Sequence, residues 1–587
     1  MANWFVAAKK ADFNKIADNF SISPMLARII RNRDIIENEE IEKFLYGTLE
    51  NLHAPELLKD MRVGADIIIK KIKEQKKIRI IGDYDIDGVC SAYILKKGLS
   101  VCDAFVDTTI PHRIHDGYGL NEQLIEQAYQ DGIDTIITCD NGIAAYEQIV
   151  YANQLGLTVV ITDHHEVPFE EQEGEKRVYL SPPAAAVINP KQETCSYPYK
   201  SICGAVVAYK FVQFLLESMG KDNHILTELL EFAAIATIGD VMPILDENRI
   251  IVKYGLASMI HTKNKGLKAL ISVNGLADKV LSPHHVGFVL GPCLNATGRL
   301  DTASRALQLF EATKDAEAAM IAADLKAIND SRKDMTEKGV EKAIQQIEGA
   351  TQKKDKVLII YLPDCHESLA GIIAGRIRER YHRPTFVLTR GAEGIKGSGR
   401  SIEAYHMYEE MSKHKELFEK YGGHKLAAGL SLKEENVELF RQLMNKDTML
   451  TESDFVEKIQ IDIPMPLRFA TKEFTEELSL LEPFGVGNQK PLFAQKNVKF
   501  LSGRILGQNK NVGKYVIEDE LQNRYDAVYF GDIEKMNQYI MEHFGMEQKL
   551  SLYEGKGTQI QFSICYYPEI NEYRGNKNLQ IIIKDYQ

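Results

Sequence analysis

Three short apolar segments in the first half of the chain are each followed by acidic residues. Residues 77–81 precede Asp83, residues 135–138 precede Asp140, and residues 158–161 precede Asp163. Helical patterns begin near Gly88 and at residues 144–155, so strands alternate with helices. This alternation predicts an α/β fold with a doubly wound parallel sheet. Because ligands of such sheets bind beyond the carboxyl ends of the strands, the acidic ends predict a functional site there.

The length and composition describe a globular protein of several domains. A chain of 587 residues is too long for one hydrophobic core, which predicts three or four domains. The start lacks a signal-peptide pattern and no run of about 18 apolar residues is present, so we expect a cytoplasmic protein without a membrane partner. The 8 cysteines never form a Cys-x-x-Cys pair, which argues against a zinc ribbon and for reduced thiols.

Periodicity divides the chain into five expected segments. They are a helical lead-in (1–75), the doubly wound domain (76–300), a long linking helix (301–350), a second, smaller αβ domain (351–455) and a C-terminal β-barrel of the OB type (456–587). No Gly or Pro interrupts residues 301–338, which predicts one or two long helices. Short strands separated by glycine turns predict the barrel.

The charge distribution is uneven along the chain. A net charge of −12 argues against a protein that coats DNA, because phosphate binding usually requires a basic surface. Between Arg376 and Arg400, however, seven basic residues stand against two acidic ones, a local charge of 7 − 2 = +5. We therefore expect this stretch to line one wall of a nucleic-acid cleft.

Residues 83–88 (DYDIDG) resemble the opening of an EF-hand calcium loop. That loop requires a helix before it and a glutamate at its twelfth position, where this chain has a strand pattern and Ile94. A helix cap explains one aspartate but not three at alternating positions. Three unpaired carboxylates repel one another unless cations neutralise them, so the pattern predicts a metal site.

Residues 163–165 (DHH) add imidazole nitrogen to this set of oxygens. A lone histidine pair is more often structural, but this pair ends a strand beside Asp87 and Asp140. Carboxylates with one or two histidines suit Mn²⁺ or Mg²⁺. Two such ions, about 3.5–4 Å apart, can hydrolyse a phosphodiester, so we expect two divalent metal ions as cofactors.

Two later motifs have weaker interpretations. His366 and Glu367 begin a pattern similar to a zinc-protease helix, but Ala370 stands where the second histidine is needed. Residues 397–401 (GSGRS) form a small basic segment that could hold a phosphate as a loop. In isolation, a surface turn is the better interpretation of this segment.

Taken in order, these segments resemble the DHH phosphoesterase superfamily and, within it, the bacterial RecJ exonucleases. The four superfamily motifs match residues 82–88, 140–142 (DNG), 163–165 and 239–243 (GDVMP). RecJ-like segments are residues 111–113, 116–120, 291–301, 366–367, 397–401, 422–429 and 482–488. The resemblance implies a DHH domain, a DHHA1-type second domain and an OB-fold nucleic-acid-binding domain at residues 456–587.

The resemblance also implies roles for matching residues. One metal would be held by Asp85 and Asp140 with Asp83 close by, and the other by Asp87, Asp140, His164 and Asp240. His165 would face the scissile phosphate and Asp163 would support the histidines. His424 would lie across the cleft, near the reacting phosphate. The residues that would grip the 5′ end of the strand are Arg113, Arg299, Ser398 and Arg400.

The implied activity is stepwise 5′-to-3′ release of mononucleotides from single-stranded DNA, in DNA repair and recombination. The expected partners are single-stranded DNA, a helicase and a single-strand-binding protein, and the expected state is a monomer. Two alternatives are a catalytically inactive DNA-binding relative and a phosphodiesterase for small substrates. Every implied ligand is present, which disfavours the first, and the OB-type segment disfavours the second.

Overall fold

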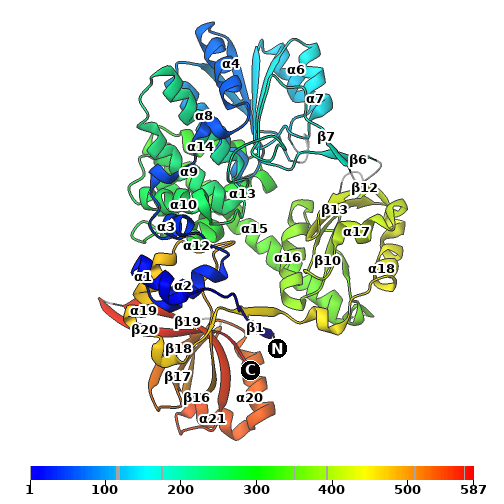
Figure 1. Cartoon of the computed structure of the whole chain (residues 1–587). Coiled ribbons are helices and arrows are strands. Elements are labelled where there is room, and N and C mark those ends of the chain that lie inside the picture. Colours follow the sequence, from blue (N-terminus) through cyan, green and yellow to red (C-terminus); the bar gives the residue numbers. More distant parts are fainter. Residues whose placement is uncertain are drawn as a thin grey trace. The chain divides into compact units, whose positions relative to one another are not determined.

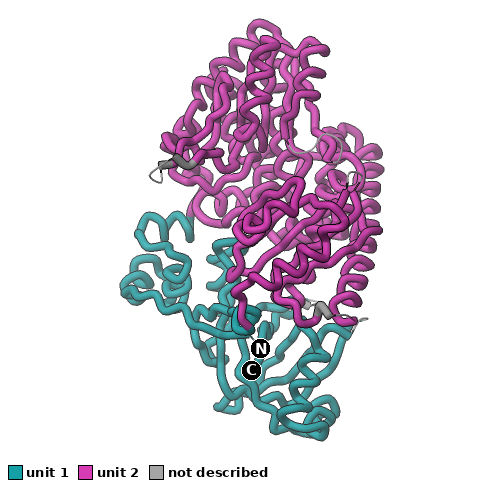
Figure 2. The backbone as a smooth tube through the Cα atoms, turned by 90° about the vertical axis from the view of Figure 1, so that its right-hand side faces the viewer, with its two compact units in different colours: residues 1–46, 452–587 teal, residues 47–451 magenta. Residues whose placement is uncertain are grey.

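The computed structural model describes residues 2–113, 119–172, 176–349, 351–391, 394–507, 510–573 and 575–587. The chain divides into two compact units, coloured in Figure 2. Unit 2 comprises residues 47–451, and unit 1 combines residues 1–46 with residues 452–587. The expected helical lead-in over residues 1–75 is therefore divided between the two units. It also begins with a strand, β1 (Asn3–Val6), before its helices.

Unit 2 contains the expected parallel sheet. Its strands lie in the order β3 (Phe105–Thr109), β2 (Lys77–Ile81), β4 (Thr135–Cys139), β5 (Thr158–Thr162) and β8 (Ala186–Ile188), and every pair is parallel. Helices cover both faces (Figure 1). They are α4 (Met61–Lys73), α5 (Ile86–Val101) and α8 (Gly204–Met219) in one core, and α6 (Glu122–Gln130) and α7 (Tyr146–Gln154) in the other. The predicted doubly wound α/β class is confirmed.

The central strands β4 and β5 are almost fully buried because helices cover both faces of the sheet, whereas the edge strand β3 is largely polar and not buried. Ile78 and Ile80 of β2 enter the core with α5, whereas Ile81 enters the core with α6. The chain leaves β2 toward β3 on one side, and β4 lies on its other side. The ends of β2 and β4 therefore form the switch point where such sheets bind ligands.

One helix, α15 (Asp315–Gly349), belongs to two hydrophobic cores of unit 2. It has 35 residues, which at 1.5 Å per residue is about 52 Å. Ile321 and Leu325 lie in the core of the parallel-sheet domain, and Ala343 and Ile347 lie in the core of the next domain. The linking helix expected within residues 301–350 is present, preceded by the short α14 (Ser304–Glu311).

The second domain contains a mixed sheet with α16 (Ala370–Tyr381) packed on it. The strand order is β12 (Phe418–Gly423), β13 (Ala427–Leu432), β11 (Gly394–Arg400), β10 (Thr385–Gly391) and β9 (Leu358–Tyr361). The interpretation of residues 397–401 as a loop or turn is wrong, because residues 397–400 complete strand β11. Gly397 serves packing: a Cβ atom there would lie 2.4 Å from Cδ2 of Leu388.

Unit 1 contains the expected closed barrel. Its strands follow the order β16 (Phe493–Leu506), β17 (Val512–Glu518), β18 (Arg524–Tyr529), β20 (Asn576–Tyr586) and β19 (Gln561–Tyr573), and pairing of β16 with β19 closes it. The start of the chain joins this unit, since β1 pairs in parallel with β14 (Lys458–Ile461). The Trp4 indole N–H also donates to Asp585 at 2.7 Å.

Two general features complete the fold. No helix in the described parts of the chain is both long and apolar enough to span a lipid bilayer. The eight cysteines are free thiols, and all except Cys365 are buried.

Candidate metal centre and phosphate-binding cluster

Four segments far apart in the sequence converge at the switch point of the parallel sheet. Strand β2 ends before Asp83, β4 before Asp140 and β5 before residues 163–165. These three strands are neighbours in the order β2-β4-β5, so the loops that follow them meet at one edge. Asp240 arrives from outside the sheet as the residue that ends helix α9 (Ile225–Gly239).

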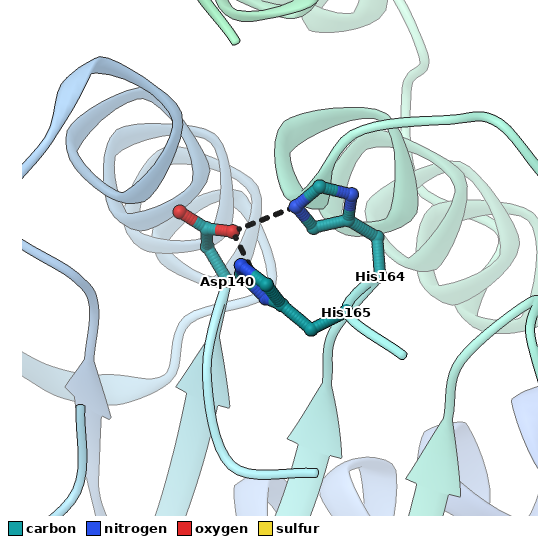
Figure 3. A group of neighbouring side chains, drawn as sticks. All are labelled: Asp140, His164 and His165. Atoms are coloured by element: carbon teal, nitrogen blue, oxygen red, sulfur yellow. Dashed lines mark ion pairs between the residues drawn. The ribbon is translucent and has the colours of Figure 1, made fainter. Parts of the chain in front are cut away.

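His164 lies at the centre of this set. Its Nε2 atom is 3.4 Å from Oδ2 of Asp87, 3.1 Å from Oδ1 of Asp140 and 3.7 Å from Oδ2 of Asp240. Figure 3 shows the rings of His164 and His165 directed at the same Asp140 carboxylate. Three carboxylates thus meet around one imidazole nitrogen: Asp87 from the first turn of α5, Asp140 from the loop after β4, and Asp240 from the end of α9.

The potential ligands form three overlapping groups, each with its ligand atoms within 4.8 Å of one another. They are Asp83, Asp85 and Asp140; Asp87, His164 and Asp240; and Asp140, His164 and His165. The first two groups contain the residues expected around the two metals. Asp140 belongs to the oxygen-rich group and also to the group with both histidines, and this last group shares His164 with Asp87 and Asp240.

The electrostatics of these residues suit bound cations. Burial and then the Asp85 charge raise the pKa of Asp83 to about 7, while burial and then the Asp87 charge raise the pKa of Asp240 to about 8. Burial and then four neighbouring carboxylates raise the pKa of Asp140 well above its usual range. The buried Oδ1 atoms of Asp83 and Asp140 accept no hydrogen bond from any residue that the structure describes. Divalent cations would supply these oxygens with partners and neutralise the repulsion.

Asp163 orients the histidine pair instead of joining the ligand groups. Its Oδ1 accepts the backbone N–H of His164 at 2.7 Å and the Nδ1–H of His165 at 2.8 Å. Its Oδ2 accepts the N–H of Ile143 at 2.9 Å. Burial acts to lower the pKa of His165, but the Asp163 hydrogen bond and charge outweigh it and raise that pKa to about 9. The hydrogen bond at Nδ1 thus fixes the orientation of the His165 ring.

The Asp83–Asp87 loop is supported by a helix that sequence reasoning had not connected with it. Asn295 of α13 (Gly291–Leu300) accepts the N–H of Ile86 at 2.9 Å. Gly298 lies so close to the loop that a Cβ atom would stand 2.4 Å from the Tyr84 carbonyl oxygen. Both residues belong to the segment 291–301 noted in the sequence. No local pattern in the sequence, however, predicts that they contact the backbone of residues 84–86.

Arginines from five segments gather near this centre and form what we call the arginine cluster: Arg113, Arg299, Arg332, Arg376, Arg378 and Arg400. Burial and then the charges of Arg113, Arg332 and Arg400 lower the pKa of Arg299 to about 10. Burial and the charge of Arg378 likewise lower the pKa of Arg400. Among the described residues, only Arg378 of this cluster forms an ion pair, with Glu379 at 3.5 Å.

A group of like charges without carboxylate partners is suited to an anion such as a phosphate. Arg113 and Arg299 belong to the substrate-binding set expected from the sequence, as does Arg400. The sequence analysis did not predict a binding role for Arg332. It lies on α15, where a charged residue is usually interpreted as part of a solvent-exposed helix face. Arg113 also contacts the Asp83–Asp87 loop, because its Cζ atom lies 4.8 Å from the centre of the Tyr84 ring.

The basic stretch 376–400 is not a continuous positive wall. Four of its seven basic residues have other contacts: Arg380, Arg383, Arg390 and Lys396. Arg390 pairs with Glu434 at 3.1 Å and Lys396 with Glu367 at 3.2 Å. That this stretch lines one wall of a nucleic-acid cleft stays a prediction, and its contribution to the arginine cluster consists of Arg376, Arg378 and Arg400.

The remaining candidates have distinct positions. Ser398 and Arg400 alternate with buried glycines on β11 and so share one face of that strand. His424 lies exposed in the β12–β13 turn, where its backbone N–H donates to the Ala427 carbonyl at 2.7 Å. It is not part of the three ligand groups found among the described residues. Residues 116–118 of the segment 116–120 lie outside the described residues.

Comparison with known proteins identifies the family. The DHH family N-terminal domain matches residues 77–237, the DHHA1 domain residues 354–448 and the RecJ OB domain residues 461–585. The single-stranded-DNA-specific exonuclease RecJ of Bacillus subtilis is 35% identical, over 97% of this chain and 69% of that protein. The Escherichia coli protein of the same name is 31% identical, over 96% of this chain and 95% of its own.

The chain belongs to the RecJ family. A crystal structure of exonuclease RecJ bound to manganese is 30% identical over 67% of this chain and 96% of that chain, with a TM-score of 0.58. The Thermus thermophilus RecJ structure with Mn²⁺ has a TM-score of 0.81 over all of this chain and 79% of that one; at 24% identity it supports the fold alone. RecJ family membership makes this chain a metal-dependent nuclease, and its three ligand groups supply carboxylate and imidazole atoms that could hold the metal ions.

Proposed function

We propose that this RecJ-family protein degrades single-stranded DNA from the 5′ end and releases 5′-mononucleotides by two-metal hydrolysis. The observation that carries the proposal is the set of three ligand groups linked through Asp140 and His164, near an arginine cluster in which, among the described residues, only Arg378 has a carboxylate partner. The groups supply places for two cations, and the cluster supplies a place for a terminal phosphate. The substrate named for the Bacillus and Escherichia relatives supports the choice of single-stranded DNA.

The assigned roles follow from the contacts of each side chain. Two divalent cations at these groups would polarise the phosphodiester, make hydroxide available at neutral pH and stabilise the leaving oxygen. His165, held by Asp163 through Nδ1, would direct Nε2 at the scissile phosphate. Its raised pKa keeps the ring protonated at neutral pH, so Nε2 could donate to a phosphate oxygen. His424, in the β12–β13 turn of the second domain, is a further catalytic candidate.

End recognition is assigned to Arg113, Arg299, Ser398 and Arg400. Guanidinium groups bind phosphate oxygens through paired N–H donors, and burial strengthens such bonds. A terminal phosphate carries more charge than an internal one, so a cluster of several arginines favours the end of a strand. Ser398 supplies a hydroxyl on the same face of β11 as Arg400.

The first test measures the direction of degradation. Single strands labelled at the 5′ or the 3′ end, a duplex and a dinucleotide are incubated with Mn²⁺ and with wild type or Asp140→Asn. We expect the single strand to be shortened from its 5′ end, and Asp140→Asn to lower the rate by more than about a hundredfold, because loss of supporting groups alone costs 10–100-fold.

Three outcomes would overturn the proposal. Digestion from the 3′ end would refute the polarity. Hydrolysis of the dinucleotide alone would identify a small-substrate phosphodiesterase. Tight binding of single strands with no cleavage in Mn²⁺ would identify an inactive DNA-binding relative.

The second test separates end recognition from chemistry by comparing two arginines of the second domain. Arg400→Ala removes a member of the arginine cluster, whereas Arg390→Ala removes an exposed arginine paired with Glu434. We expect Arg400→Ala to raise KM for 5′-phosphorylated strands and to abolish the preference over 5′-hydroxyl strands, with Mn²⁺ affinity unchanged. Arg390→Ala should resemble wild type. An equal effect of both substitutions would refute the role of Arg400.

The wider context of the proposal is DNA repair and recombination in the cytoplasm, with the protein acting as a monomer beside a helicase and a single-strand-binding protein. The activity named for the bacterial relatives supports it. Free thiols also suit a reducing compartment. Loss of the protein should sensitise cells to damage whose repair requires resection of a 5′ end. Unchanged survival, where no second nuclease of this polarity exists, would contradict this context.

A further inference from the structure

Helix α8 begins directly beneath the metal centre without a side-chain cap. Cys203, the residue before the helix, has an extended backbone and makes no capping hydrogen bond with its side chain. The first N–H groups of a helix have no partners within it, so they need acceptors from elsewhere. Here the acceptor is a metal-ligand candidate.

Asp87 provides both of its carboxylate oxygens to this helix end. The Gly204 N–H donates to Oδ2 of Asp87 and the Ala205 N–H donates to Oδ1, each at 2.7 Å. The Asp87 side chain is fully buried, and its Oδ2 atom is also the one that faces Nε2 of His164. Two bonds to one carboxylate fix both its position and the orientation of its plane.

Gly204 also contacts a second ligand candidate, Asp140. A Cβ atom on Gly204 would lie 2.8 Å from Cβ of Asp140 and 3.1 Å from its Oδ1 atom. Asp140 itself has a left-handed backbone with φ of 60°, so its side chain has little freedom to move aside. Gly204 therefore contacts two candidate ligands: its N–H donates to Asp87, and its Cα, which carries no side chain, packs against Asp140.

We propose that the N-terminus of α8, through Gly204 and Ala205, is a positioning element that sets the spacing of Asp87 and Asp140 and hence of the two cations. This inference rests on the two-metal site of the proposed function. Gly204 and Ala205 are positioning residues, because they act through ligands and do not contact the substrate. Glycine is required at 204, since any side chain would displace Asp140.

The rest of α8 makes this element rigid. Most of its 16 residues are buried, and it packs along α5, the helix whose first turn carries Asp87. Farther along the same helix pair, Gly98 meets Val212, where a Cβ atom would lie 2.4 Å from Cγ1 of Val212. Gly98 and Gly204 thus both make tight contacts in this helix pair, and of these two glycines only Gly204 contacts metal-ligand candidates.

The test uses the full-length protein and two substitutions at the helix start. Ala205→Pro removes one N–H donor at a helix position where proline is tolerated, and Gly204→Ala adds the methyl group beside Asp140. Mn²⁺ affinity and stoichiometry are measured by calorimetry and by electron paramagnetic resonance, and folding by circular dichroism in chelator. We expect each of the two substitutions to weaken Mn²⁺ binding by about 10–100-fold while the metal-free protein stays folded.

Two control variants separate metal positioning from packing. Ala205→Gly keeps the N–H donor and should bind Mn²⁺ like wild type. Gly98→Ala creates a comparable clash in the same helix pair and should lower the melting temperature without changing Mn²⁺ affinity.

The outcomes distinguish this inference from the proposed function. Unchanged Mn²⁺ affinity in either folded test variant would overturn the inference, as would an equal loss in Gly98→Ala. If Ala205→Pro does not fold, Gly204→Ala decides the result. Unfolding of both, with Gly98→Ala folded, would also overturn it by showing a general structural role. If wild type itself binds fewer than two Mn²⁺ ions, the two-metal proposal fails instead.

Discussion

Asp85 has two structural roles at the start of helix α5. Its Oδ1 atom accepts the backbone N–H groups of Asp87 at 2.9 Å and Gly88 at 3.1 Å, so it is the N-cap of the helix. It also belongs to the ligand group with Asp83 and Asp140. The capping interpretation, sufficient for one aspartate, holds for this one. Asp83, in contrast, has a raised pKa because it is buried beside the Asp85 charge, so its protonation and metal binding are linked.

This linkage predicts a pH-dependent affinity for Mn²⁺. The raised pKa values of Asp83 and Asp240, about 7 and about 8, mean that protons compete with the metal below these values. We expect the dissociation constant for Mn²⁺ to fall as pH rises from 6 to 8.5, by up to about tenfold per pH unit for each proton displaced. Calorimetry in buffers of different ionisation enthalpy would count the protons released.

The same pKa shifts determine whether the stability of the metal-free fold rises or falls with pH. Both carboxyl groups have folded-state pKa values above the unfolded value of about 4, so they favour the metal-free fold at low pH and lose this contribution as pH rises through 7 to 8. Mn²⁺ should therefore raise the melting temperature more at pH 8.5 than at pH 6. A pH-independent increase would contradict the assigned protonation states.

At the scale of elements, helix α13 determines where the Asp83–Asp87 loop lies. Asn295 and Gly298, one turn apart on the same helix, contact the backbone of Ile86 and Tyr84. Strand β11 shows the same dependence on neighbours. Its glycines suggest a loop when taken alone, yet Gly397 and Gly399 are glycines because Leu388 and Phe386 leave no room for a side chain.

The α13 contact predicts opposite effects for one substitution at two positions. Gly298→Ala places a methyl group against the Tyr84 carbonyl and should lower the free energy of unfolding by about 1–3 kcal/mol, with weaker Mn²⁺ binding. Gly349→Ala, near the end of α15, has no described atom within 4 Å of the new Cβ. It should raise stability by up to about 1 kcal/mol. Urea denaturation with and without Mn²⁺ would measure both, and equal effects would contradict the role of α13.

At the scale of the whole molecule, the structural units do not follow the order of segments along the chain. Helix α15 joins two domains by contributing to both of their cores, Ile321 to one and Ile347 to the other. Unit 1, in contrast, combines the two ends of the chain, with Trp4 bonded to Asp585. All of the metal-ligand candidates lie in unit 2.

The single tryptophan allows a test of this division. Trp4 reports on unit 1, whereas Mn²⁺ binds unit 2. Because a ligand stabilises only the folded unit that binds it, we expect Mn²⁺ to raise the melting temperature seen by circular dichroism and to leave the tryptophan-emission transition unchanged. Asp140→Asn should abolish the first shift. Coincident transitions that move together with Mn²⁺ would show that the two units unfold as one.

The sequence by itself determined the elements and the chemistry of the ligands. Strand β2 occupies the residues predicted for it, because an apolar run with polar ends is a local signal. The aspartates and histidines could be predicted to meet, because parallel strands place their carboxyl ends at one edge. The barrel was also predictable in kind, although its longest strand, β16, was not recognised.

Only the tertiary structure decided how these residues are held. The contact of Gly204 with Asp87 joins residues 117 positions apart, and that of Asn295 with Ile86 joins residues 209 apart. The donors in both are backbone N–H groups, which every residue except proline possesses, so no residue type marks them in the sequence. The arginine cluster likewise depends on α15 bringing Arg332 beside Arg299. Residue types specify which atoms can bind a metal or a phosphate, but long-range packing decides which of them are positioned to do so.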